Sequence, residues 1–415
     1  MNSNTDILKS LLPNIIDKKQ QQSLLNAISI GIPSMKNEEW KYTYYNKIID
    51  NNFSNITSKA DDAYKLSDGT IDEIKNHIET QFNATYKIVF VDGVFIAELS
   101  YIPNTPKFTF WNSNNIEEQA TKDFLLELNN ALSSDGININ IDKSFEEEKA
   151  IAILYIATKS DQIINLKHKI NIAKKTQVHF TEYYINPNHL KTYYNIVNNI
   201  SIHENSIVKW DKIQNGKQQF YITDNTFVQQ EKSSIFTVNT ITVSGAITRN
   251  NLVVDINGEH AECNMNGLYL LNGHEHCDNR TKVNHNQPNT NSNELYKGIV
   301  DGEATGVFNG KILVDQIAQK TNAFQSNKNI IINDKANIYT KPQLEIFADD
   351  VKCSHGATIA QIEDTELFYL QARGIGKEKA RALLTIAFAE EVIEKVDSKD
   401  SCNYLIEAVE AKLNI

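Results

Sequence analysis

The feature that most constrains the fold is a short apolar–polar–apolar pattern that recurs at nearly constant steps. Successive copies are separated by 30, 26, 28, 44 and 32 residues. One repeat of this length cannot bury its own apolar face, so repeats stack into a solenoid whose coils contribute parallel, hydrogen-bonded strands. The one long step predicts a loop projecting from the stack at about residues 278–293, a stretch rich in Asn, Thr and Ser. The copies begin at Ile172, Ile202, Val228, Ile256, Val300 and Ile332.

The predicted fold is therefore mainly β, with a parallel β-helix over residues 85–349 and helical domains on both sides. Apolar residues at helical spacing lie between residues 6 and 30 and end at Gly31-Ile-Pro33, which stops a helix. We expect an N-terminal helical domain over residues 1–84 and a C-terminal helical domain over residues 350–415. A helical insertion interrupts the β region at about residues 116–132. The apolar stripe along the predicted C-terminal helix either packs against its own domain or docks another protein.

Charge and cysteine usage narrow the classes of function. A net charge of −11 argues against binding to nucleic acid or to an anionic membrane surface. The longest apolar run, at about residues 151–157, is far shorter than the roughly 20 residues of a membrane-spanning helix, and the N-terminus has no secretory signal. The four cysteines form no Cys-x-x-Cys pair, which favours free thiols in a reducing cytoplasm. No phosphate-binding loop occurs, so we do not expect the chain to hydrolyse ATP by itself.

One stretch near the end of the predicted β-helix, residues 341–358, carries candidate chemistry. It begins with strand-like alternation and then places Asp349, Asp350, Cys353 and His355 within seven residues. If the strand continues, Cys353 and His355 point to one face and Ser354 to the other. A thiol beside an imidazole suits iron, zinc or copper, or thiolate chemistry. The alternative is that both are ordinary residues at the edge of the core.

A second polar cluster is His274-Glu-His-Cys277, with His260, Cys263 and His285 nearby in the sequence. On a strand, His274 and His276 share a face, and a third ligand from a neighbouring coil would complete a metal site. The alternative is that these histidines make ordinary hydrogen bonds.

Several stretches resemble the SufD family of scaffold subunits in the Suf iron–sulfur cluster assembly system. The run at residues 341–358, followed by residues 367–375, carries the resemblance. It is strongest from residue 266 to residue 375, which includes the segments 296–300, 307–312 and 318–321. Nearer the N-terminus, Gly31-Ile-Pro33 and Glu38-Glu-Trp-Lys-Tyr-Thr43 also fit the family pattern. The resemblance implies a right-handed parallel β-helix flanked by helical domains. It further implies pairing with a SufB-like subunit through the β-helix and docking of a SufC-like ATPase on the C-terminal helices, which would place nucleotide hydrolysis in the partner.

The resemblance also assigns a site. By position in the family's Cys-Ser-His-Gly motif, His355 would line the interface at which nascent clusters form, with Cys353 beside it, while the main cysteine lies in the SufB-like subunit. The expected protein is a cytoplasmic, non-enzymatic scaffold that handles a transient cluster or iron at this interface and holds none tightly when isolated. The sequence is also compatible with a homodimer of the isolated chain. The alternatives are a β-helix metalloenzyme using His274, His276 and Cys277 or Cys353, and a purely structural interaction module.

Overall fold

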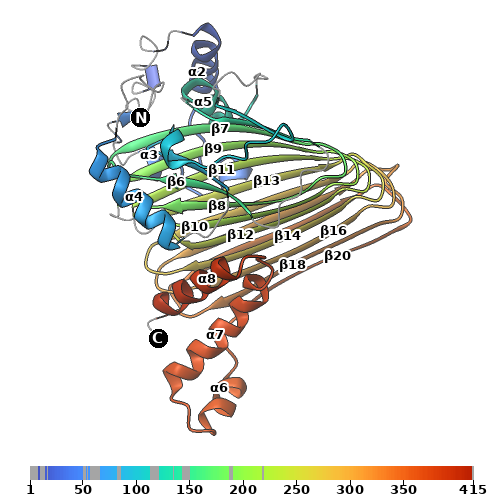
Figure 1. Ribbon diagram of the computed structural model, residues 1–415. Coiled ribbons are helices and arrows are strands. Elements are labelled where there is room, and N and C mark those ends of the chain that lie inside the picture. The colour runs from blue at the N-terminus through green and yellow to red at the C-terminus, as the bar shows by residue number, and fades with distance from the viewer. Residues whose placement is uncertain are drawn as a thin grey trace.

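The chain forms two large parallel sheets that face each other and are joined at both sides by tight turns. This description rests on a computed structural model, which describes residues 8–9, 15, 17–49, 53, 55–56, 66–81, 86–112, 121–133, 135–142, 150–186, 190–216 and 219–413. From β5 onward, consecutive strands alternate between the sheets, so each coil contributes one strand to each sheet (Figure 1). The predicted parallel β-helix is therefore confirmed.

The first sheet has the strand order β19-β17-β15-β13-β11-β9-β7-β5-β4, with β1 also pairing with β7, and the second has the order β20-β18-β16-β14-β12-β10-β8-β6-β2-β3. All pairs are parallel except β2 with β3 and β4 with β5. The strands are β1 (Asn55–Ile56), β2 (Tyr86–Val91), β3 (Val94–Phe95), β4 (Phe108–Asn112), β5 (Ile137–Ile141), β6 (Ile151–Ile156), β7 (Gln162–Ile172), β8 (Gln177–Ile185), β9 (Thr192–Ile202), β10 (Ile207–Asn215), β11 (Phe220–Gln230), β12 (Ile235–Ser244), β13 (Ile247–Ile256), β14 (Glu262–Leu271), β15 (His276–His285), β16 (Asn291–Val300), β17 (Thr305–Val314), β18 (Thr321–Ile331), β19 (Asn337–Ile346) and β20 (Val351–Ala360).

The space between the sheets, which we call the lumen, is filled by columns of side chains from residues in register on neighbouring strands. Trp210 on β10, for example, lies opposite Phe180 on β8 and stacks on it with ring centroids 4.6 Å apart. Fully burying one such aromatic side chain stabilises the fold by roughly 1.5–3 kcal/mol. Because every second residue of a strand faces the lumen, alternation in the sequence converts directly into this core.

One corner of each coil from β7–β8 to β17–β18 is marked by a residue with positive φ. These residues lie between strands that end on one sheet and strands that begin on the other, and their φ values fall between 54° and 61°. A left-handed residue lets the chain reverse within a few residues, and the corner repeats with the period of the coil. The corner residues are Lys175, Asn205, Ser233, His260, Asn289 and Lys320.

The predicted projecting loop at residues 278–293 is wrong, because this stretch belongs to β15 and β16. The end of β15 is His285, which is in register with Ile256 on β13. A polar residue thus occupies the place of the expected apolar one. The next apolar copy that the pattern detects, Val300, ends β16 in the other sheet. The long step is therefore a change of sheet, and no residues are inserted.

Helices cover both outer faces of the sheets. Near the N-terminus, α2 (Lys18–Ile30) and α5 (Phe124–Leu132) pack together against outward residues of the first sheet, and α5 lies within the predicted insertion, whose first residues, 116–120, fall outside the described residues. Each of these two helices begins at an aspartate whose side chain accepts backbone N–H groups. The other helices are α3 (Asn46–Ile49), α4 (Asp68–Gln81), α6 (Asp364–Gln371), α7 (Lys377–Ile393) and α8 (Lys399–Lys412), with short 3₁₀ turns at Glu38–Trp40 and Ala97–Leu99.

The C-terminal helices both pack on the β-helix and project from it. The end of α7 and α8 bury Val392, Ile393 and Leu405 against the second sheet, whereas α6 and the start of α7 extend away from it (Figure 1). This packing accounts for part of the apolar stripe predicted on α7. Strand β20 continues the β-helix to Ala360, so the helical segment begins at Asp364 and not at residue 350 as expected. Within the described residues, no helix is long and apolar enough to cross a membrane.

Candidate functional site at the open end of the β-helix

The last coil, formed by β19 and β20, is open on its outer side. Each of these strands is the terminal strand of its sheet and pairs with one neighbour, β17 or β18, within the described chain. Large apolar side chains of this coil are exposed, among them Ile346, Phe347 and Ile359 at 38%, 61% and 47%. An unpaired sheet edge with exposed apolar residues is suited to pairing with a strand of another chain. This end of the molecule therefore has the properties of an interface.

The predicted pair Cys353 and His355 lies on β20, at this open end. The strand does continue through the motif: Cys353 is in register with Ala323 and His355 with Gln325, both of which face the lumen and are buried. Cys353 and His355 therefore point into the mouth of the lumen, and Ser354 points to the outer face, as expected from strand geometry. His355 is exposed, whereas Cys353 is half-buried.

The two side chains differ in their ability to bind a metal at pH 7. Burial raises the pKa of the Cys353 thiol, opposed by a backbone hydrogen bond from Ala323, so this cysteine is neutral at pH 7 and needs a bound metal to lose its proton. The exposed imidazole of His355 can bind a metal through a neutral ring nitrogen. An imidazole is a borderline ligand suited to iron, and one such ligand on a surface strand lets the metal leave again.

The second predicted cluster is not gathered into one site. Cys277 faces the lumen and is fully buried, while its neighbour His276 faces the outside of the first sheet. His274 precedes β15, is 85% exposed and lies 3.5 Å from the carboxylate of Glu303. Among the described residues, no three His, Cys, Asp or Glu side chains are grouped as a metal site requires. The structure thus does not bring together the ligands of the metalloenzyme alternative.

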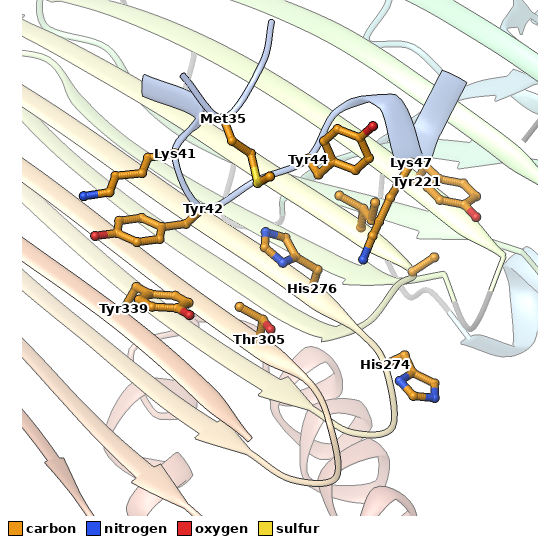
Figure 2. Close-up of a pocket in the computed structure, with 12 residues that line it drawn as sticks. Met35, Lys41, Tyr42, Tyr44, Lys47, Tyr221, His274, His276, Thr305 and Tyr339 are labelled. Atoms are coloured by element: carbon orange, nitrogen blue, oxygen red, sulfur yellow. The ribbon is translucent and has the colours of Figure 1, made fainter. Parts of the chain in front are cut away.

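His276 instead lines a pocket of about 750 Å³ between the first sheet and the segment before α3 (Figure 2). Its ring nitrogen Nε2 lies 2.9 Å from the Thr43 hydroxyl, and burial lowers the pKa of His276 to about 4, although nearby Asp278 opposes this. The ring of Tyr42 stacks on Tyr339 of β19 with centroids 4.3 Å apart. Three of the side chains that line the pocket, those of Tyr42, His276 and Tyr339, are therefore already engaged within the chain. It is lined by Met35, Lys41, Tyr42, Tyr44, Lys47, Tyr221, Ala246, Ile247, His274, His276, Thr305 and Tyr339.

The Glu38–Thr43 segment that fits the family pattern packs on the outside of the first sheet. Trp40 is buried beneath the guanidinium of Arg249, which lies 3.7 Å from the ring centroid. Arg249 pairs with Asp278, and the Thr43 hydroxyl donates to the same carboxylate at 2.6 Å. These contacts show that the segment packs on the first sheet.

Two lumen residues near His355 were missed from the sequence. Glu294 on β16 and Gln325 on β18 are buried, and the amide of Gln325 donates to a carboxylate oxygen of Glu294 at 2.6 Å. Neither lies in a recognisable motif. The signal that could have identified them is the coil period, because residues about 30 positions before His355 lie directly beneath it.

Comparison with known proteins agrees with this architecture. Residues 155–388 match the family described as SUF system FeS cluster assembly, SufBD core domain. The iron–sulfur cluster assembly protein SufD of Escherichia coli is 30% identical over 90% of this chain and 88% of its own length. A SufBD family protein of Synechocystis is 29% identical over 92% of this chain and 87% of its own length. Bacillus subtilis SufD is 21% identical over 94% and 92%.

The matched region contains the β-helix from β7 to β20 and most of α7, and the relatives extend along nearly the whole chain. The chain therefore belongs to the SufBD family of iron–sulfur cluster assembly proteins and is a SufD-like member of it.

Proposed function

We propose that this chain is a non-catalytic scaffold that pairs with a SufB-like subunit through its last coil and helps assemble a nascent iron–sulfur cluster there. The observation that carries the proposal is the position of His355. It is an exposed imidazole at the mouth of the lumen, on a strand whose outer edge has no partner in the described chain. A partner strand on this edge would enclose the imidazole between two subunits.

In this proposal the chain holds the cluster only transiently and supplies few of the ligands that bind its iron. His355 supplies one nitrogen, and Cys353 contributes only after losing its proton to a bound metal, because burial raises its pKa. The remaining ligands come from the SufB-like subunit. All four cysteines are free thiols, which fits a cytoplasmic protein.

A SufC-like ATPase would dock on α6 and the first half of α7. Phe368, Tyr369 and Leu383 are exposed there at 71%, 56% and 41%. The helix α6 and the start of α7, which carry these residues, extend away from the β-helix (Figure 1). ATP hydrolysis would then belong to that partner, and its motion would reach the β-helix through α7 and α8, which pack on the second sheet.

The test compares His355→Ala with Ser354→Ala in the complex of this chain with its SufB-like and SufC-like partners. Ser354 is the matched control because it lies on the same exposed strand and faces the other way. We expect both complexes to assemble, with cluster formation depressed only by His355→Ala. Equal rates of cluster formation in the two variants would contradict the proposed role of His355. Cys353→Ala, tested alongside, reports whether the thiol takes part.

A further inference from the structure

Two buried polar side chains lie directly beneath His355 in the lumen. Glu294, Gln325 and His355 are consecutive members of one in-register column, carried by β16, β18 and β20. The next residue inward is Met265, which is apolar. The polar part of the column is therefore confined to the last coils, and His355 is its outermost member.

The orientation of the Gln325 amide follows from its surroundings. Its nitrogen Nε2 donates to Glu294 Oε2 at 2.6 Å, and both residues are almost fully buried, at 3% and 4% exposure. Across the lumen, Gly310 leaves the space that the amide occupies, since a Cβ at that position would lie 2.2 Å from Nε2. Because a carboxylate oxygen accepts hydrogen bonds and only the amide nitrogen can donate one, the amide is held with its nitrogen toward Glu294.

This arrangement leaves a buried oxygen atom without a partner. Within the described chain, Gln325 Oε1 has no hydrogen-bond donor. A buried acceptor without a donor loses its hydration without gaining a hydrogen bond, which is unfavourable. Burial raises the pKa of Glu294 to about 7, opposed by the Thr281 hydroxyl and the Gln325 amide. A cost of this kind directly below the proposed cluster ligand suggests that a donor arrives when the complex forms.

We propose that Gln325, held in place by Glu294, positions the His355 imidazole by accepting its inward ring N–H when a partner subunit covers the mouth of the lumen. The outward ring nitrogen then keeps its lone pair and faces the partner, where iron would bind. Histidines that bind metals generally donate their other ring N–H to a carbonyl or carboxylate, which fixes the tautomer and the ring orientation. Gln325 and Glu294 are thus positioning residues, and the inference rests on the proposed function of His355.

The experiment compares three variants in the full complex with the SufB-like and SufC-like subunits. Gln325→Leu removes the acceptor oxygen, whereas the double variant Gln325→Glu with Glu294→Gln keeps an acceptor oxygen at position 325 and an amide donor opposite it. Asn327→Leu is the control, since Asn327 is equally buried on the same strand and its amide donates to the backbone oxygen of Tyr296. Cluster assembly rates are measured together with the free energy of unfolding. The His355 tautomer is read by solid-state nitrogen-15 NMR, assigned by comparison with His355→Ala.

We expect Gln325→Leu to slow cluster assembly by about tenfold or more and to leave His355 as a mixture of tautomers. The double variant Gln325→Glu with Glu294→Gln should retain a single tautomer and most of the rate. Asn327→Leu should lose stability to a similar extent without changing the tautomer. The inference is overturned if Gln325→Leu matches Asn327→Leu in both rate and tautomer. If His355→Ala itself assembles clusters normally, the proposed function fails, and the tautomer measurement still decides whether Gln325 orients the ring.

Discussion

His285 is in register with Ile256 and fills the lumen position that isoleucine occupies at the ends of β7, β9 and β13. Its two ring nitrogens lie 2.7 Å from the Thr290 hydroxyl and 2.9 Å from the Ser292 hydroxyl. A fully buried imidazole is thus accommodated without a metal, because both of its polar atoms are bonded. Burial lowers its pKa from 6.5 to about 4.

The first prediction concerns the pH dependence that this buried histidine creates. Between pH 6.5 and about 4, His285 binds a proton only in the unfolded chain, so its contribution to stability is complete above pH 6.5 and is lost as the pH falls toward 4. His285→Gln keeps polar atoms at the site and removes this titration. The free energy of unfolding of wild type relative to this variant should fall by roughly 2–3 kcal/mol between pH 7.5 and 4.5, measured by urea denaturation. A constant difference across this range would contradict the account.

A second prediction concerns a buried ion pair in the lumen. The amine of Lys212 donates to both carboxylate oxygens of Asp224, at 2.9 and 2.7 Å, and to the Thr226 hydroxyl at 2.7 Å. Lys212→Met leaves a buried carboxylate without its cation and should destabilise the fold by about 3–5 kcal/mol. The double variant Lys212→Met with Asp224→Asn should recover a large part of that loss in urea unfolding. A double variant no more stable than the single one would show that the pair itself is not the cause.

The third prediction tests the open edge as an interface. Ile359→Lys places a charge among the exposed apolar residues at the mouth of the lumen. We expect the dissociation constant for the SufB-like subunit to rise by about tenfold or more, and any self-association of the isolated chain to weaken with it. The control is Phe324→Lys, which alters a residue of similar exposure on the outer face of β18. Analytical ultracentrifugation measures both effects. Equal affinities of the two variants for the SufB-like subunit would exclude this edge as its binding surface.

The fourth prediction tests the C-terminal docking face. Phe368→Asp charges the most exposed large apolar residue of α6 and should release the SufC-like ATPase while the SufB-like subunit stays bound. Leu25→Asp on α2, exposed at 46% near the other end of the chain, is the matched control. Co-purification with tagged partners measures how much of each partner the two variants retain. Retention of the ATPase by Phe368→Asp would place its docking site elsewhere.

The coil period was readable from the sequence because lumen positions are mostly apolar, and the register of Cys353 with His355 followed from strand alternation. The apolar pattern skips one coil at His285, because a hydrogen-bonded histidine occupies the lumen position where an apolar residue is expected. The expected end of the β-helix at residue 349 is too early. Strand β20 continues the alternation with Val351, Cys353 and Ile359, but His355-Gly356 interrupts the apolar pattern in its middle. Gln325 and Glu294 could not be identified, because only the three-dimensional register places them beneath His355.

The central claim is that an imidazole nitrogen of this chain binds iron of the nascent cluster. Its most direct test is electron–nuclear double resonance on the paramagnetic, iron-loaded complex, with nitrogen-15 histidine incorporated into this chain alone. The account predicts a nitrogen-15 coupling to the cluster that disappears in His355→Ala and persists in Ser354→Ala. A cluster assembled with no such coupling, or a coupling that survives His355→Ala, would contradict it.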